Sequence, residues 1–149
     1  MTSIASRSMN RAQNASIWLT MAWITALIAT LSAIFIGEIL GRTPCVLCWY
    51  QRIFMFPLAL LLGIACYRDD SNAWHYALPL AGLGGGFAAY HTLLYWRVIE
   101  PEIVACSAEA SCSGAGMVIF GSLPLPLLSL LAFTLIVVSL LIVRHHAKK

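Results

Sequence analysis

The chain has 149 residues, of which 60% are hydrophobic and only 10% are charged, and its formal net charge is +3. Soluble globular domains carry about 25% charged residues, so this composition excludes a soluble protein and indicates one integral membrane domain in a lipid bilayer. The basic residues are spread over loops and tails rather than clustered, so we expect no nucleic acid partner.

Four segments are apolar enough to form transmembrane helices, which need about 20 residues each. They cover approximately residues 17–40, 49–67, 74–96 and 125–143. The first is long and lacks the cleavage site of a signal peptide, so we expect it to remain as a helix. The sequence therefore predicts an all-α fold: a four-helix transmembrane bundle forming one domain over residues 1–149, with outer loops at 41–48 and 97–124.

Positive charges in short loops predict the orientation, because cytoplasmic loops carry an excess of lysine and arginine. With the N-terminus in the cytoplasm, the inside residues are Arg7, Arg11, Arg68, Arg144, Lys148 and Lys149. The outside residues are then Arg42, Arg52 and Arg97. This bias places both termini in the cytoplasm and the loops at 41–48 and 97–124 outside.

The third predicted span is rich in small residues, and Gly82 and Gly86 form a GxxxG pair. Small residues let membrane helices approach one another closely, so we expect this pair to lie at a helix contact. The alternative is that the glycines provide a smooth wall for a flat ligand.

Four of the five cysteines form two close pairs, one in each predicted outer loop. Cys45 and Cys48 form a CxxC motif, and Cys106 and Cys112 follow in the second loop. Paired cysteines persist as disulfides in oxidising compartments such as the bacterial periplasm or the cell exterior. CxxC pairs are usually catalytic or metal-binding rather than structural. Two such pairs at one membrane face predict a relay that works by thiol–disulfide exchange.

Other interpretations of the cysteines stay open at this point. Four cysteines can form a zinc site, although the spacing of the second pair is longer than is typical, and we expect no metal. The pairs can also be two inert structural disulfides. Cys66 lies alone near the far end of the second span, where it is expected to behave as a small hydrophobic residue.

Ionisable residues inside membrane spans are costly and therefore suggest function. Arg52 follows Cys48 by four residues, so both lie on one face if a helix begins there. A cation at this place would stabilise the Cys48 thiolate, which the helix N-terminus also favours, or a reduced, anionic cofactor. His91, in the outer half of the third span, is either a ligand-binding residue or a hydrogen-bonded residue of the bundle. Glu38 is expected to reach the membrane interface.

The string Pro44-Cys45-Val46-Leu47-Cys48-Trp49-Tyr50-Gln51-Arg52 resembles the signature of the DsbB family, membrane quinone reductases that form protein disulfides. The dipeptide Tyr90-His91, the pair Cys106 and Cys112, and the four-span layout also fit this family. The resemblance covers about residues 17–143. The short second outer loop is similar to the short-loop, BdbC-like members, whereas better-known members have a longer one.

The resemblance implies a protein-disulfide oxidoreductase whose catalytic residues are Cys45, Cys48, Cys106 and Cys112. A soluble DsbA-like oxidase with a thioredoxin fold would deliver electrons by attack on Cys106, and Cys45–Cys48 would reoxidise the second pair. Cys48 would pass the electrons to a quinone, ubiquinone or menaquinone, from the membrane pool, with Arg52 contacting the quinone and His91 helping to hold it.

The resemblance also implies a location and leaves two alternatives. The protein would lie in the bacterial cytoplasmic (inner) membrane, with its redox loops facing the periplasm or the cell exterior. One alternative is an enzyme like vitamin K epoxide reductase, which also uses four cysteines and a quinone. The other is a non-enzymatic membrane module that binds a metal through four cysteines.

Overall fold

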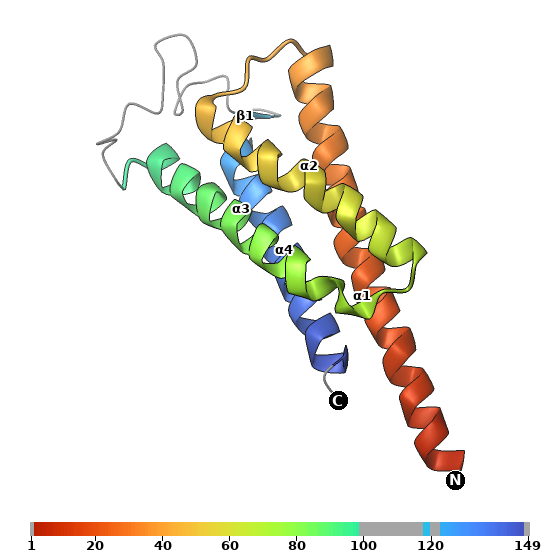
Figure 1. Ribbon diagram of the computed structural model, residues 1–149. Helices are drawn as coiled ribbons and strands as arrows, with labels where there is room; N and C mark the ends of the chain where they lie inside the picture. The colour runs from red at the N-terminus through yellow and green to blue at the C-terminus, as the bar shows by residue number, and fades with distance from the viewer. Residues whose placement is uncertain (1, 99–117, 120–122, 148–149) are drawn as a thin grey trace.

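The computed structural model describes residues 2–98, 118–119 and 123–147 (Figure 1). Its elements in chain order are α1 (Thr2–Ile34), a π-helical turn (Phe35–Ile39), α2 (Val46–Tyr67), a 3₁₀ turn (Ser71–Ala73), α3 (Trp74–Tyr95), β1 (Val118–Ile119), β2 (Leu123–Pro124) and α4 (Leu125–Ala147). The strands β1 and β2 form a short antiparallel ladder in which Val118 is opposite Pro124 and Ile119 is opposite Leu123. Four helices dominate the fold, so the predicted all-α class is confirmed.

Within the described part of the chain, three stretches of helix are long and apolar enough to cross a membrane: Gln13–Ile39, Val46–Tyr67 and Leu125–Ala147. The helix α3 is as long as α2, at 22 residues, but its glycines, its proline and its two histidines lower its mean hydropathy. It packs against both α2 and α4, and α1 packs against α2 and α4. The four helices therefore form one bundle of a membrane protein.

The two ends of the bundle carry different features. The beginning of α1 and the end of α4 lie at one end, and the connection from α1 to α2 lies at the other end together with β1 (Figure 1). This arrangement agrees with the prediction that both termini lie on the same side of the membrane.

The helix α2 begins at Val46, three residues before the start predicted at Trp49. Cys45 is its N-cap: the backbone there is extended, and the Sγ atom accepts a hydrogen bond of 3.2 Å from the backbone N–H of Cys48. The first N–H groups of a helix have no partner within the helix, so a side-chain acceptor at this place stabilises the helix start. The CxxC motif therefore lies on the first turn of α2 instead of in the preceding loop.

The core is apolar, and small residues bring the helices close together. Alanines at four fully buried positions of α1 and α3 face the larger side chains of α2 and α4. These residues are Ala22, Ala26, Ala77 and Ala81, with Leu58, Leu62, Phe133, Ile136 and Leu140. This packing holds α2 and α3 side by side along the bundle.

The glycines of α3 pack differently from the prediction. Gly84 lies against Phe133 of α4, where an added Cβ atom would collide with the ring. Gly82 and Gly86 face open space among the described residues, since nothing lies within 4 Å of a Cβ atom built there. The predicted contact through Gly82 and Gly86 is therefore wrong, and the close approach of α3 to α4 depends on Gly84.

Candidate functional site

The CxxC motif packs into a small cluster at the end of the bundle away from the termini. Cys45 is buried, with 1% of its surface exposed, and Cys48 is half-buried. Around them lie side chains of α2 and of the last turns of α3: Leu47, Phe87, Tyr90, Leu94 and Tyr95. The tertiary packing of α2 on α3 therefore encloses Cys45, which the sequence placed in an open loop.

His91 lies next to Cys45. Its Nε2 atom is 3.8 Å from the Sγ atom of Cys45, and its Nδ1 atom is 2.9 Å from the Nε2 atom of Gln51. The histidine is 1% exposed and Gln51 is 8% exposed. The structure thus brings together the CxxC motif and the histidine that the sequence singled out 43 residues later (91 against 48), and it adds Gln51.

The surroundings favour a thiolate at Cys45. Hydrogen bonding from Cys48 is the largest effect and lowers the pKa of Cys45, and the hydrogen bond of His91 lowers the pKa further. Burial raises it but is outweighed. A cysteine with a lowered pKa exchanges with disulfides at neutral pH more readily than an ordinary thiol, because the thiolate is the nucleophile.

Arg52 reaches from α2 towards the end of α1. Its Nη2 atom donates a hydrogen bond of 2.7 Å to the backbone carbonyl of Ala33, and its guanidinium lies 5.4 Å from the centre of the Trp49 ring. The guanidinium also interacts electrostatically with Cys48, one turn earlier on α2. The predicted proximity of Arg52 and Cys48 is therefore present in the structure.

The π-helical turn at the end of α1 makes room for this arginine. Leu40 donates its N–H to the carbonyl of Phe35, five residues earlier, at 3.1 Å. Gly37 lies within the turn, and a Cβ atom there would come 2.9 Å from Nη2 of Arg52. Single π-helical turns occur often at functional sites. The end of α1 is therefore part of the site, although nothing in the sequence pattern marked it.

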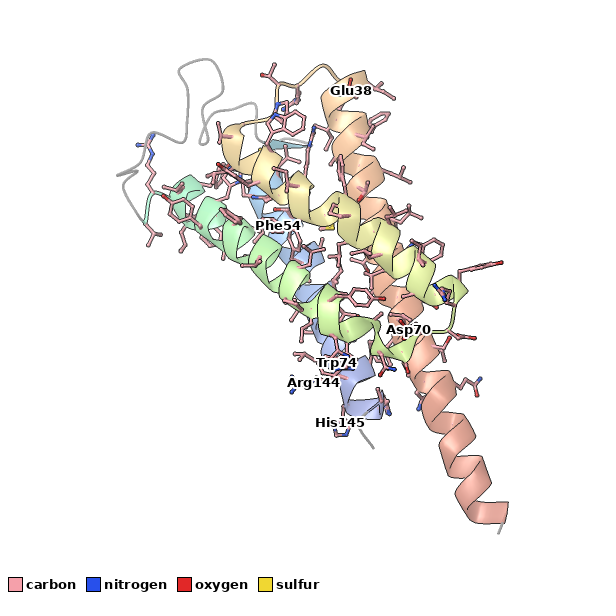
Figure 2. The ribbon with its side chains drawn as sticks, viewed as in Figure 1. Glu38, Phe54, Asp70, Trp74, Arg144 and His145 are labelled. Atoms are coloured by element: carbon pink, nitrogen blue, oxygen red, sulfur yellow. The ribbon has the colours of Figure 1, made fainter. Side chains whose placement is uncertain are left out.

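An aromatic column lies beside the motif. The rings of Tyr50 and Phe54 on α2 stack on Phe87 of α3, with centroids 5.1 Å and 5.5 Å apart. Figure 2 shows Phe54 on α2 midway along the bundle and Glu38 at the end of α1. Glu38 is exposed, in agreement with the expected place at the interface.

Of the other three cysteines, only Cys66 belongs to the part of the chain that the structure describes. Cys106 and Cys112 fall outside the described residues, so their pairing and their relation to Cys45 stay predictions. Cys66 lies near the other end of α2, half-buried against the apolar core and next to Thr20 of α1.

The cluster also has the donor atoms of a metal site. The sulfur atoms of Cys45 and Cys48 and a ring nitrogen of His91 lie within 4.8 Å of one another. Two thiolates and an imidazole suit zinc, which takes four ligands in structural sites. The described residues supply three such ligands in this group.

Comparison with known proteins matches this chain to one family. Residues 14–143 match the family model described as "Disulfide bond formation protein DsbB". A "Probable disulfide formation protein" of Metapseudomonas resinovorans is 55% identical over 86% of this chain and 90% of its own length. A "Probable disulfide formation protein" of Deinococcus radiodurans is 43% identical over 79% of this chain and 82% of its own length.

A third relative is found in Bacillus subtilis. The "Disulfide bond formation protein C" of Bacillus subtilis is 39% identical over 85% of this chain and 91% of its own length. No solved structure matches the chain. The matched region contains the whole cluster of Cys45, Cys48, Gln51, Arg52 and His91. The resemblance seen in the sequence is thus confirmed, and the chain belongs to the DsbB family of disulfide bond formation proteins, membrane thiol oxidoreductases that work with a thiol partner.

Proposed function

We propose that the chain reoxidises an extracytoplasmic, DsbA-like thiol oxidase and passes the electrons through its two cysteine pairs to a membrane quinone. The observation that carries this proposal is the CxxC motif on the first turn of α2, beside a half-buried arginine. A reactive pair at the start of an apolar helix can exchange with thiols outside the membrane and still lie next to a ligand that is dissolved in it.

The residues around Cys48 fit a quinone. Arg52 has five N–H donors and makes one hydrogen bond, to Ala33, among the described residues, so donors remain for a carbonyl oxygen. The aromatic column of Tyr50, Phe54 and Phe87 offers flat surfaces on the α3 side of the motif. When bound, a quinone accepts two electrons and two protons from the thiols. Ubiquinone and menaquinone share the carbonyl oxygens that Arg52 would bind, so the proposal covers both.

In this proposal His91 supports the quinone site without contacting the quinone. Its two ring nitrogens face Cys45 and Gln51, so it would hold the wall of the quinone site by fixing α3 against α2. In the proposed relay the partner's thiolate attacks Cys106, the pair Cys106–Cys112 is reoxidised by Cys45–Cys48, and Cys48 passes the electrons on.

The proposed location follows from the charge distribution and the family. Both termini would lie in the cytoplasm, and the CxxC end of the bundle would face the periplasm or the cell exterior across the bacterial inner membrane. Labelling with a membrane-impermeant thiol reagent in reduced, intact cells or spheroplasts tests this. Reaction of Cys106 and Cys112 only after permeabilisation would contradict the orientation.

The proposed activity is tested with purified protein, a reduced DsbA-like partner and a soluble quinone analogue, by following quinone absorbance and the thiols of the partner. We expect one quinone to be reduced for each disulfide formed in the partner. Net transfer from a reduced quinone to the partner's disulfide would instead support the alternative of an enzyme like vitamin K epoxide reductase.

A metal-binding module is the second candidate, favoured by the spacing of Cys45, Cys48 and His91. The two candidates differ in their response to metal removal. We expect a chelator to leave quinone reduction unchanged and quinone to restore the disulfides of the reduced protein. Stoichiometric zinc in the purified protein, with no disulfide formed on addition of quinone, would favour the metal module.

A further inference from the structure

Gln51 is a buried amide on the apolar helix α2. It is 8% exposed and its Nε2 atom lies 2.9 Å from Nδ1 of His91, on the neighbouring helix α3. Burying an amide is costly unless its hydrogen bonds are made, so a glutamine at this depth needs a partner. The partner here is a histidine that in turn contacts a redox-active cysteine.

The direction of this hydrogen bond fixes the position of the histidine proton. An amide nitrogen only donates, so Nδ1 of His91 is the acceptor, and the single proton of the neutral ring is then on Nε2. The Nε2 atom lies 3.8 Å from Sγ of Cys45. An N–H group therefore points at the sulfur, where the other tautomer would present a lone pair and repel a thiolate.

We propose that Gln51 is a positioning residue that keeps the proton of His91 on Nε2 and so holds Cys45 as a thiolate when the Cys45–Cys48 disulfide is reduced. The proposal rests on the proposed function, in which this pair accepts electrons from a dithiol. The backbone N–H of Cys48, 3.2 Å from the same sulfur, is the second donor.

Electrons and protons are both conserved in the reduction step. The incoming dithiol loses its two S–H bonds and forms a disulfide, and the S–S bond between Cys45 and Cys48 breaks and takes up the two electrons. Cys48 receives one proton and becomes a thiol, Cys45 stays a thiolate beside His91, and the second proton is released to water. Stabilising the thiolate stabilises the reduced pair, so Gln51 raises the reduction potential and makes the pair a better electron acceptor.

The test measures the equilibrium between the full-length protein and dithiothreitol or glutathione buffers, with thiols counted by mass after alkylation. It needs neither quinone nor the partner, so a failure of the proposed function does not affect it. In Gln51→Met, which keeps the length of the side chain, we expect the equilibrium constant for reducing Cys45–Cys48 to fall about tenfold, or about 30 mV in potential. The potential of Cys106–Cys112 is expected to stay constant.

Thr92→Val is the matched control. Thr92 adjoins His91 and is 3% exposed, and its hydroxyl donates to the carbonyl of Ala88 in its own helix, at 2.8 Å. The substitution Thr92→Val therefore removes a buried hydrogen bond without touching the cysteines. The reduction potential of Cys45–Cys48 in this variant should equal that of the unaltered protein. An equal change in both variants, or none in Gln51→Met, would overturn the proposal.

A double-mutant cycle tests whether Gln51 acts through the histidine. With His91→Phe in place, Gln51→Met should cause no further fall in the potential. Additive effects would show that Gln51 acts directly or through general packing, and would contradict the positioning role. Gln51→Leu serves as the second variant if Gln51→Met does not fold.

Discussion

Both ends of α2 carry cysteine, but the side chains around the cysteines differ between the two ends. At the first turn, Cys45 and Cys48 lie among His91, Gln51 and Arg52, each with a defined hydrogen-bond or charge partner. Near the last turn, Cys66 lies against the apolar core cluster.

The polar side chains at that other end belong to the surface. Tyr76 donates to Asp70, which caps the turn before α3, and Arg144 lies 5.0 Å from the centre of the Trp74 ring. Figure 2 shows Asp70, Trp74, Arg144 and His145 gathered at this end, far from Glu38. Cysteine reactivity in this bundle therefore depends on polar partners that neighbouring helices supply, and not on the presence of a cysteine in a helix.

The largest expected effect distinguishes the two ends directly. Cys48→Ser should reduce quinone-dependent oxidation of the partner to the uncatalysed background, because the last sulfur of the relay is lost, while Cys106–Cys112 still accepts one round of electrons. Cys66→Ala on the same helix should oxidise the partner at the normal rate. The measurement is the rate of partner oxidation, with quench-and-alkylate analysis of a single turnover. Continued turnover in Cys48→Ser would refute the relay order.

Removing the arginine should have the next largest effect. Arg52→Ala is expected to raise KM for quinone more than it changes binding of the partner, since a lost charge-assisted hydrogen bond costs roughly 1.5–3 kcal/mol, on the order of ten- to a hundredfold in affinity. Arg52→Lys should recover part of this, because lysine keeps the charge and loses the planar fork. Steady-state quinone titrations decide: a normal KM in Arg52→Ala, at normal protein levels, would remove Arg52 from the site.

The pH dependence of the potential tests the thiolate at Cys45. Its lowered pKa, caused first by Cys48 and then by His91, means that two electrons enter the pair with one proton around neutral pH. The potential should then fall by about 30 mV for each pH unit, whereas two protons would give about 59 mV. Below the pKa of Cys45 the steeper slope should return. The measurement uses Cys106→Ser/Cys112→Ser at a series of pH values, and the steeper slope at neutral pH would contradict the thiolate.

The smallest expected effect concerns the contact between α1 and Arg52. Gly37→Ala places a Cβ atom 2.9 Å from Nη2, so the flexible guanidinium must move while the backbone stays. We expect KM for quinone to rise roughly three- to tenfold, or up to about 1.4 kcal/mol. Gly82→Ala is the matched control, because a Cβ atom there meets nothing within 4 Å.

Gly82 lies within the α-helix α3, where alanine gains about 1 kcal/mol in helix propensity, and Gly37 lies in the π-helical turn, so thermal stability is measured for both variants. The quinone titration then separates them. An equal KM in the two variants would show that the position of Arg52 does not depend on Gly37.

Much of the fold was predictable because apolar runs of membrane length fix the helices before any tertiary contact is known. The ends of the helices were less predictable. Cys45 caps α2 at an earlier position than hydropathy suggests, because capping depends on one hydrogen bond and not on composition. The role of Gly84 was missed since Phe133, which it contacts, comes from a helix 49 positions later (133 against 84).

The site was predictable in its reactive groups and not in their arrangement. Cys45, Cys48, Arg52 and His91 stand out because their chemistry is unusual within a membrane span. Gln51 was missed, although a polar amide near the start of α2 was the available signal, because its meaning depends on a contact with α3. The carbonyl of Ala33 has no side-chain signature at all.

The π-helical turn at Phe35–Ile39 is the last turn of the first membrane span, and Leu40 caps it. One residue more than in an α-helix fits into such a turn, because its hydrogen bonds reach back five residues. The carbonyl of Ala33, which accepts from Arg52, lies before the turn, whereas Gly37, next to the same guanidinium, lies within it. Arg52 therefore contacts both the regular helix and its wider end. Deleting one residue within the turn would leave the Ala33 carbonyl in place and shift the part of the wall that Gly37 provides.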